Sequence, residues 1–410
     1  MSSSELVRVR HATTTRRHRV LNGFVWTLAA VAGFGLVFTQ MSLAKWDDTL
    51  VTVNIDPLLG PDRPAAPQNP VDGASGVPVN VLLMGSDDRS GENGVIGGQE
   101  AGKRNDTTLI AHISADRSRI DVVSIPRDTV VRIADCDRSD GTSQRGWTGL
   151  FNIAFANGAE NGSSSDGAAC AIKTVESLTD IYIDHFVVVD FVGFQDMVDA
   201  VGGIPMCIPN DVEDAYSRTD LSAGPQVLDG REALAYARMR HGTGLTGSDL
   251  DRIDRQQELL KNLASKVLSA EMLYRPQDLT NFVKAVAGSM TMDEGFGDFN
   301  TLTGLAFSMR GINPNTDVTF ATAPIIGDPN DSNHVIFSSD APAVWQAIIN
   351  DQPIAPLLDA QSNAPVNDST IATGTGGTDP SAAPSSPAAT PAGGSTAPSQ
   401  EDILNACTAG

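Results

Sequence analysis

Cationic residues are scarce in this chain of 410 residues. It holds 28 Lys and Arg against 50 Asp and Glu, which gives a formal net charge of -22 at pH 7. A nucleic-acid-binding protein needs surplus positive charge to displace counterions from phosphates, so this class is excluded. The hydrophobic fraction of 41% excludes both a polytopic membrane protein and a wholly disordered chain.

Cysteine is also rare, and the motifs of several enzyme classes are missing. Four Cys are too few for a disulfide-built scaffold, and no C-x-x-C pair suggests zinc. The sequence has no Walker loop and no G-x-S-x-G elbow. Cys136 and Cys170 flank a loop and the start of a predicted helix, so they can bridge. Cys207 and Cys407 are unassigned, and three connectivities are open.

One long stretch lacks charge altogether. Residues 20–43 are predicted to form a transmembrane helix, because roughly 20 apolar residues cross a hydrocarbon core. A basic tail, residues 1–19, precedes this stretch and acidic residues follow it, which places the N-terminus in the cytoplasm and the remainder outside. A cleaved signal peptide is the alternative. The predicted location is the plasma membrane, with a single pass and an extracytoplasmic body.

Composition divides the remainder of the chain into three parts. Residues 44–76 are rich in Pro, Gly and Asp and are predicted to be an extended spacer. Residues 77–358 have the composition of one globular domain. Residues 359–410 consist mostly of Ala, Pro, Ser, Thr and Gly, and such a segment cannot bury enough apolar surface to offset its chain entropy. It is predicted to be a disordered tail.

Both the strand and the helix periodicities occur within residues 77–358. Strands are predicted at Val79–Met84, Thr107–Ser114, Arg119–Ile125, His185–Phe191 and Asp317–Ala323. Helices are predicted at Ala168–Leu178, Phe191–Val201, Arg231–Arg238, Leu250–Leu268, Pro276–Ala287 and Phe299–Arg310. Strands that pair locally and alternate with helices predict an α/β fold, with three α/β/α layers and a central mixed sheet.

Arginine and aspartate occur together where the predicted strands end. The strand-end residues are Asp87, Arg89, Arg104, Asp106 and Arg127. Charged residues at strand ends can line one crevice at the edge of a sheet. A second group comprises Arg238 and Arg240, followed by Arg252, Arg255 and Gln256 on one face of a helix that begins near Ser248 or Asp249.

These two groups together suggest a site for phosphate. The planar guanidinium matches phosphate oxygens in bidentate geometry, and Mg²⁺ favours one or two carboxylates plus phosphate oxygens. A pyrophosphate held by arginines, with a metal held by Asp, is therefore one interpretation. Structural Asp–Arg ion pairs are the other interpretation, and spacing alone does not separate the two. The segment Gly91–Gly102 between Arg89 and Arg104 is predicted to be a mobile lid.

Seven motifs in order resemble the LytR–CpsA–Psr family of cell-wall glycopolymer ligases, over roughly residues 77–350. They are Val-Leu-Leu-Met-Gly-Ser-Asp-Asp-Arg, Arg-Asn-Asp-Thr, Val-Ser-Ile-Pro-Arg-Asp-Thr, Phe-Asn-Ile-Ala-Phe, Val-Gly-Gly-Ile, Ala-Tyr-Ala-Arg-Met-Arg-His and Asp-Arg-Ile-Asp-Arg-Gln-Gln. The basic cytoplasmic tail and single anchor also resemble that family. Cys136 and Cys170 resemble its actinobacterial branch.

The resemblance implies an enzyme, a phosphotransferase. It would move a glycopolymer phosphate from a polyprenyl-pyrophosphate carrier onto peptidoglycan, with Mg²⁺ or Mn²⁺ as cofactor and pyrophosphatase activity as a side reaction. The implied acceptor is the 6-hydroxyl of N-acetylmuramic acid, and the lipid tail lies in an apolar pocket between sheet and helices. In the actinobacterial branch the glycan is often arabinogalactan.

By motif position the resemblance also implies residue roles. The implied metal ligands are Asp87 and Asp106, and the implied catalytic residues are Arg127, Arg238, Arg252 and Asp249. The implied pyrophosphate-binding residues are Arg89, Arg104, Arg127, Arg238, Arg240, Arg252, Arg255 and Gln256. The general base stays open between Asp106, Asp249 and a metal-bound arrangement that needs no side-chain base.

This chain departs from the family pattern in two places. The segment Gly91–Gly102 is long and glycine-rich, and a low-complexity tail stands where some relatives carry a folded domain. Two competing functions are a non-catalytic binder or sensor of lipid-linked glycan, and a transcriptional regulator. The acidic charge and the outward topology argue against the regulator.

Overall fold

The computed structural model describes residues 51–67, 76–87, 93, 96, 103–160, 162–214, 219–239, 249–267, 290–362 and 407. The chain divides into two compact units, residues 1–50 and 51–410. The predicted transmembrane segment 20–43, the predicted helix Pro276–Ala287 and most of the predicted tail lie outside the described residues. Within the described ranges, no helix has both the length and the apolar character needed to cross a membrane.

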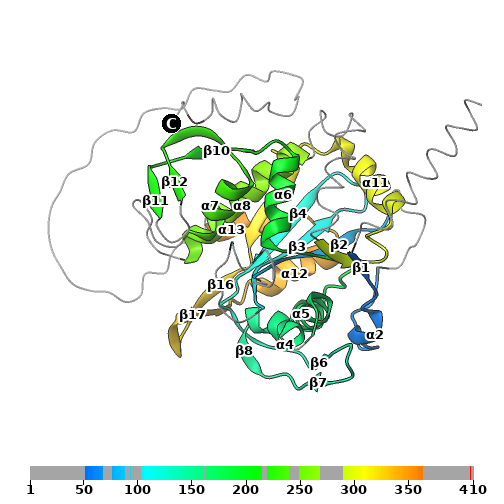
Figure 1. Ribbon diagram of the computed structural model, residues 1–410. Helices are drawn as coiled ribbons and strands as arrows, with labels where there is room; N and C mark the ends of the chain where they lie inside the picture. Colours follow the sequence, from blue (N-terminus) through cyan, green and yellow to red (C-terminus); the bar gives the residue numbers. More distant parts are fainter. Residues whose placement is uncertain are drawn as a thin grey trace, which may run out of the picture. The chain divides into compact units, whose positions relative to one another are not determined.

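A seven-stranded mixed sheet forms the centre of the domain (Figure 1). Its order is β1 (Val51–Val53), β14 (Met290–Asp293), β9 (His185–Val189), β2 (Val79–Ser86), β3 (Asn105–Ile113), β4 (Ile120–Ile125) and β15 (Val318–Thr322). Strands β9, β2, β4 and β15 run in one direction, and β1, β14 and β3 run in the other. The predicted α/β fold with a central mixed sheet is confirmed.

The strands β3 and β4 form the hairpin that the sequence predicts. Their register pairs Ile113 with Ile120 and Thr108 with Ile125. In the turn, the Ser114 hydroxyl oxygen accepts hydrogen bonds from the backbone N–H groups of Ser118 and Arg119, both at 3.1 Å. The side chain thus satisfies backbone donors that the short turn leaves unpaired.

The larger apolar core covers one face of the sheet. Helices α2 (Asp56–Leu59), α4 (Asn152–Ala159), α5 (Ser164–Thr179), α12 (Ala341–Ile349) and α13 (Ala355–Ser362) contribute to it. They pack Phe151, Phe155 and Trp345 against alternate strand residues such as Leu82 and Ile110. Helix α5 begins with a capping box in which Ser163 and Asp166 satisfy each other's backbone N–H groups.

A second apolar cluster belongs to the other side of the sheet. It joins α6 (Phe191–Ala200), α7 (Gly230–Arg238) and α8 (Asp249–Val267) to the ribbon of β10 (Ile204–Ile208) and β13 (Gly224–Leu228). Tyr236, Met206 and Leu259 are buried within it. Figure 1 shows α6, α7 and α8 on one side of the sheet and α4 and α5 on the other, so helices cover both faces.

The prediction that residues 44–76 form an extended spacer is wrong for part of this segment. Strand β1 pairs with β14 in the main sheet, and Ile55 and Leu59 are buried in the larger core. The guanidinium of Arg63 lies against Glu176, with 2.6 Å between Nη2 and Oε1. Three strand residues and one helical turn are too short to produce a periodic pattern, and their partners lie more than 100 residues away.

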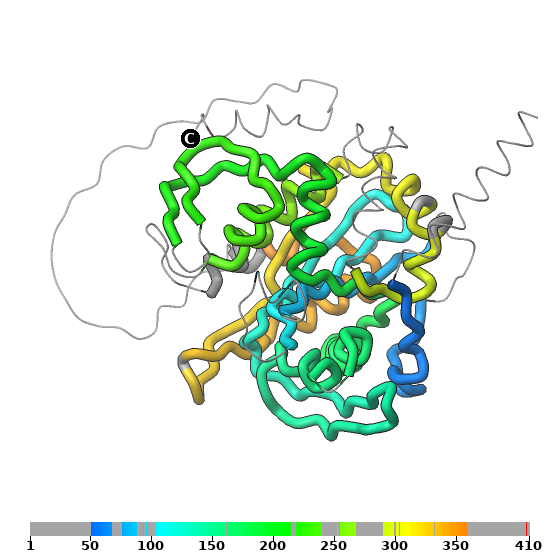
Figure 2. The backbone as a smooth tube through the Cα atoms, in the orientation of Figure 1, coloured from blue at the N-terminus to red at the C-terminus, as the bar shows by residue number. Residues whose placement is uncertain are grey.

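Several further elements were not predicted. Helices α4, α12 and α13 are among them, and α13 runs past the predicted domain boundary at residue 358. Short paired strands are β5 (Val130–Arg132) with β8 (Thr148–Leu150), β6 (Cys136–Asp137) with β7 (Ser143–Gln144), and β11 (Val212–Asp214) with β12 (Thr219–Leu221). The hairpin of β16 (Ile325–Asp328) and β17 (Asp331–Phe337), gold in Figure 2, extends away from the sheet. After β14 come α11 (Phe299–Ser308) and the short turn η2 (Met309–Gly311).

Two disulfides link the four Cys. The predicted bridge between Cys136 and Cys170 is confirmed, with 5.1 Å between the Cα atoms, and it ties β6 to α5. Cys207 of β10 is bonded to Cys407, with a Cα–Cα distance of 5.4 Å. Because no Cys is left free, the three connectivities that the sequence leaves open reduce to one.

Candidate active site

The predicted site residues gather at one end of the sheet. The four strands that run in the same direction, β9, β2, β4 and β15, all end there. In open α/β sheets, ligands bind outside the carboxyl ends of such strands. Asp87 directly follows β2, and Arg127 follows β4 after Pro126. This end of the sheet is called the site end below.

Arg127 and Asp106 meet at the site end. The Arg127 Nη1 atom lies 3.0 Å from Asp106 Oδ1, and its Nε atom lies 3.2 Å from Asp128 Oδ2. Asp106 occupies an irregularity in the β2–β3 register, because Gly85 pairs with Thr107 while Ser86 pairs with Asn105. Bulges next to active sites re-aim side chains. The Asp106 side chain is 40% exposed, so this carboxylate is accessible from solution.

The predicted metal ligands stand on neighbouring strands. The backbone N–H of Asp87 donates to the Arg104 carbonyl at 2.8 Å, which fixes β2 against the start of β3 just before Asp106. In the described part of the chain, no three His, Cys, Asp or Glu residues come together as a metal site. Mg²⁺ commonly takes one or two carboxylates and completes its shell with phosphate oxygens and water, so Asp87 and Asp106 are the residues here that could hold it.

Helix α8 approaches the site end from the second layer. The Gln256 side chain donates to the Ala237 carbonyl at 3.0 Å and accepts from the Thr107 hydroxyl at 3.4 Å. One residue later, Gln257 donates to the Thr322 hydroxyl of β15 at 3.0 Å. These contacts seat α8 across β3 and β15 and bring Gln256 next to the strand residue that follows Asp106.

Two arginines of α8 lie close to this contact. Arg252 is one turn before Gln256 on the same face and is only 4% exposed. Arg255 donates from Nη2 to the Met239 carbonyl at 2.7 Å. Its Nε is buried and has no hydrogen-bond partner among the described residues. A buried guanidinium N–H without a partner is costly, and an anionic ligand would satisfy it.

Arg238 ends α7 and lies over an aromatic ring. Its guanidinium carbon is 4.2 Å from the centroid of Phe191, the first residue of α6. The neighbouring Tyr236 is buried, and burial together with the charge of Glu258 raises the pKa of its phenol to about 12, against the opposing charge of Arg255. Tyr236 therefore stays neutral at physiological pH and does not serve as a base.

The structure places part of the predicted site at the site end or on the helix that contacts it. Asp87, Asp106, Arg127, Arg252, Arg255 and Gln256 belong to the site end or to the part of α8 that contacts it. Arg104 contributes its carbonyl there, while its side chain is exposed. Arg89 and Arg240 lie outside the described residues, as does the side chain of Asp249, so these predictions stay untested.

Both sequence interpretations have a counterpart in the structure. Arg127 pairs with two carboxylates, as structural ion pairs would, whereas Arg255 contacts a backbone carbonyl and keeps a buried N–H unpaired. Phe191 and Thr107 were missed by sequence reasoning, since an aromatic at a helix start and a Thr within a strand carry no signal by themselves.

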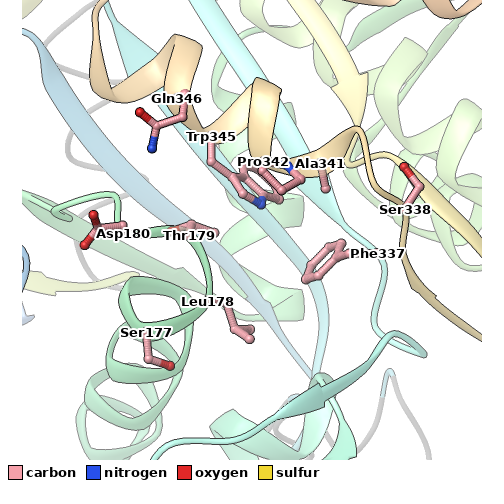
Figure 3. A pocket seen from close by; sticks show the side chains of 10 residues that line it. All are labelled: Ser177, Leu178, Thr179, Asp180, Phe337, Ser338, Ala341, Pro342, Trp345 and Gln346. Atoms are coloured by element: carbon pink, nitrogen blue, oxygen red, sulfur yellow. The ribbon is translucent and has the colours of Figure 1, made fainter.

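A surface pocket lies apart from these residues. Figure 3 shows Trp345 and Phe337 facing it, with the rings in an edge contact at 5.7 Å between centroids. Its lining comes from the C-terminal end of α5, from α12 and from the segment between β17 and α12. None of these elements carries a predicted site residue, so the pocket is not part of the candidate active site.

Comparisons with known proteins identify relatives of this chain. The family described as the LytR_cpsA_psr family matches residues 54–346. The cell wall biosynthesis protein LcpA of Corynebacterium glutamicum is 33% identical over 321 residues, which cover 73% of this chain and 60% of LcpA. The polyisoprenyl-teichoic acid–peptidoglycan teichoic acid transferase TagU of Enterococcus faecalis is 32% identical over 225 residues, which cover 55% of this chain and 64% of TagU.

A solved structure shows a similar fold. The crystal structure of TagV from Bacillus subtilis superposes with a TM-score of 0.50 and 26% identity, covering 67% of this chain and 98% of TagV. The chain spans about three fifths of the length of the curated relatives LcpA and TagU.

Proposed function

This chain belongs to the LytR–CpsA–Psr family, and we propose from that premise that it transfers a glycopolymer phosphate from a polyprenyl-pyrophosphate carrier onto peptidoglycan. The relatives LcpA and TagU carry names of cell wall biosynthesis and of teichoic acid transfer to peptidoglycan. The observation that carries the proposal is that Arg127 contacts Asp106 at the strand ends, while Gln256 of α8 contacts Thr107, the residue that follows Asp106.

The arginines supply the chemistry that phosphoryl transfer requires. Such transfer depends on positioning and on the stabilisation of charge on the phosphoryl oxygens, with little covalent work for the protein. The unpaired Nε of Arg255 is oriented before the substrate arrives, because Nη2 of the same group is held by the Met239 carbonyl. A phosphate oxygen at this Nε satisfies a buried donor, so binding gains from a group that is otherwise unsatisfied.

Asp87 and Asp106 are the proposed ligands of Mg²⁺ or Mn²⁺. A bound ion would supply charge neutralisation on the pyrophosphate oxygens. Arg127 keeps Asp106 in place through the 3.0 Å contact between Nη1 and Oδ1. Pyrophosphatase activity is the proposed side reaction: when water replaces the acceptor hydroxyl, it breaks the pyrophosphate bond and yields the glycan phosphate and polyprenyl phosphate.

One face of the sheet suits the lipid part of the carrier. The paired residues Leu83, Leu109 and Val187 share the face that bears Thr107 at the site end. None of them belongs to either of the two packed apolar clusters. We propose that the isoprenoid chain lies along this face, between the sheet and the helices, with its pyrophosphate toward the arginines.

The remaining parts of the proposal follow from the family resemblance. The acceptor is the 6-hydroxyl of N-acetylmuramic acid, and the glycan is arabinogalactan, as in the actinobacterial branch to which LcpA and LcpB of Corynebacterium glutamicum belong. Residues 20–43 are the proposed single membrane anchor, with the site on the extracytoplasmic side. An anchor keeps the site near a lipid-borne donor and so raises its effective concentration.

Turnover by the purified full chain tests the proposal. The protein in detergent is given a polyprenyl-pyrophosphate glycan and peptidoglycan fragments, with and without Mg²⁺. We expect metal-dependent transfer, and metal-dependent hydrolysis of the donor to glycan phosphate and polyprenyl phosphate when the acceptor is omitted. Tight binding of the donor without turnover under either condition would instead identify a binder or sensor of lipid-linked glycan.

A further inference from the structure

The guanidinium of Arg238 lies over the aromatic ring of Phe191. Its central carbon lies 4.2 Å from the centroid of Phe191. Arg238 is the last residue of α7 and Phe191 the first of α6, so both come from helix ends, where the backbone is held on one side only. A cation over an aromatic face is attracted to it, and the ring therefore determines where the charge sits.

The beginning of α6 is held by two side chains. Asp190, the N-cap, accepts from the Gly193 N–H at 2.8 Å. Asn93 accepts from the Val192 N–H at 2.9 Å and donates from its amide to the other oxygen of Asp190, also at 2.9 Å. One amide thus binds the residues on both sides of Phe191, and Asn93 is only 8% exposed. Each bond satisfies a helix N-terminus or its cap.

Asn93 reaches α6 from the glycine-rich segment Gly91–Gly102. That segment connects β2 to β3, and its base is closed at the site end by the 2.8 Å bond between the Asp87 N–H and the Arg104 carbonyl. Asn93, which lies in the connection between β2 and β3, therefore binds the end of the helix that carries the ring under Arg238.

We infer that Phe191 is a positioning residue for Arg238, and that Asn93 couples the connection between β2 and β3 to that position. The inference rests on the proposed function, because Arg238 is assigned to the pyrophosphate there. Phe191 makes no use of its own chemistry on the substrate; its ring fixes the direction of the guanidinium. Asn93 fixes the ring by binding the Asp190 carboxylate before it and the Val192 backbone N–H after it.

Two substitutions of Phe191 test the inference, because they distinguish the effect of the aromatic face from the effect of side-chain size. In the full chain, Phe191→Tyr keeps an aromatic face, whereas Phe191→Leu keeps burial but loses the face. With the polyprenyl-pyrophosphate glycan donor we expect Phe191→Leu to lower kcat/KM about tenfold, mainly through kcat, and Phe191→Tyr to stay within about twofold of the wild type. Asn93→Ala should lower kcat several-fold.

A second arginine stack serves as the matched control. Arg310 lies 4.0 Å over Phe307 on the exposed end of α11, and neither residue belongs to the site. Phe307→Leu should leave kcat and KM unchanged. Thermal unfolding of every variant separates loss of fold from loss of position. Equal kinetics for Phe191→Leu and Phe191→Tyr, at equal stability, would overturn the inference.

A spectroscopic measurement keeps the inference separate from the proposed function. In protein labelled with ¹³C-arginine, the ring current of Phe191 should shift the Hδ protons of Arg238, and the shift should vanish in Phe191→Leu and shrink in Asn93→Ala. If the wild type has no turnover but these shifts are seen, the proposed function fails while the positioning stands. If turnover is present and no shift is seen, the positioning is wrong.

Discussion

Arginine plays different parts at the two ends of the central sheet. At the end opposite the site, Arg63 donates to Glu176 from Nε and Nη2, to the Ile183 carbonyl from Nη2 and to the Tyr182 hydroxyl from Nη1, and it lies 4.1 Å over the Tyr182 ring. At the site end, Arg255 binds one carbonyl and leaves a buried Nε unpaired. The first guanidinium is saturated by the protein, and the second is not.

The contrast shows how a structural arginine differs from a ligand-binding one. Both are partly or mostly removed from water, and both belong to an acidic protein with carboxylates to spare. The difference lies in whether folding alone satisfies the donors. Folding satisfies Arg63, so its charge stabilises the fold. Arg117, in the turn between β3 and β4, also keeps a buried Nε unpaired among the described residues, so an unpaired donor points to a ligand only where its helix contacts the site end, as α8 does for Arg255.

The largest effect should come from removing a charge at the site end. Arg127→Ala removes a cation that faces Asp106 and the proposed phosphate. We expect kcat to fall about 10² to 10³-fold, as for the loss of one preorganised donor, with little change in stability because Asp106 is well exposed. Glycan transfer and thermal unfolding are measured together. Full transfer activity in this variant would show that Arg127 has a structural role, like Arg63, and does not act on the substrate.

The opposite end should respond in stability and not in activity. Arg63→Ala leaves Glu176, which is 4% exposed, as an unpaired buried carboxylate. We expect the free energy of unfolding to fall by about 3 kcal/mol, with kcat of the folded protein unchanged. Denaturant unfolding measures the loss. The double variant Arg63→Ala with Glu176→Gln should recover part of it, and no recovery would show that lost packing dominates.

A smaller, pH-dependent effect is expected from Asp293 at the same end. Burial raises the pKa of this carboxyl, but it is outweighed by the hydrogen bond and charge of His185 and by the N–H groups of Phe296 and Phe186, so the pKa lies below its ordinary value. The unfolded chain then binds the proton more readily, and stability rises with pH. The contribution is complete above the unfolded pKa, near 4, and is lost as the pH falls through the folded value.

Unfolding of Asp293→Asn between pH 3 and pH 7, in steps of about one unit across the range in which carboxyls titrate, tests this expectation. The wild type should be the more stable protein at pH 7, and the difference should narrow as the solution becomes acidic. A difference that stays constant with pH would mean that Asp293 acts through hydrogen bonds that its charge does not affect.

The smallest effect should come from the contact between the layers. Thr107→Val keeps the shape of the side chain and removes the 3.4 Å hydrogen bond to Gln256. A bond of this length contributes little, so we expect a change of about twofold in kcat. Gln256→Ala, which also releases the Ala237 carbonyl, should cost more. Equal losses in the two variants would mean that the strand contact, rather than the helix contact, holds Gln256.

Local sequence patterns predicted the central elements because their periodicity is strong. Strands β2, β3, β4, β9 and β15 and helices α5, α6, α7, α8 and α11 lie where alternation or helical spacing places them. Helix α4 was missed because its Ala, Gly and Asn residues give almost no amphipathic contrast. Strand β1 was missed because its identity depends on β14, more than 200 residues away.

The candidate site was predictable as a set of charges but not as an arrangement. The spacing of Arg252, Arg255 and Gln256 identifies a shared helix face, and Asp106 and Arg127 stand at strand ends. The sequence does not show which N–H groups of Arg255 remain unpaired, because this depends on the position of the Met239 carbonyl in the folded protein. Asn93 forms hydrogen bonds with the start of α6, about 100 residues later in the sequence, and no local pattern predicts a contact between such distant residues.

The bond between Cys207 and Cys407 makes a closed ring of the polypeptide from β10 to the far end of the chain. A protease that cuts once between residues 363 and 406 would therefore yield a nicked molecule of unchanged mass apart from one added water. Only a reducing agent would then release the terminal peptide. On a denaturing gel such a nick shows itself in the reduced lane alone.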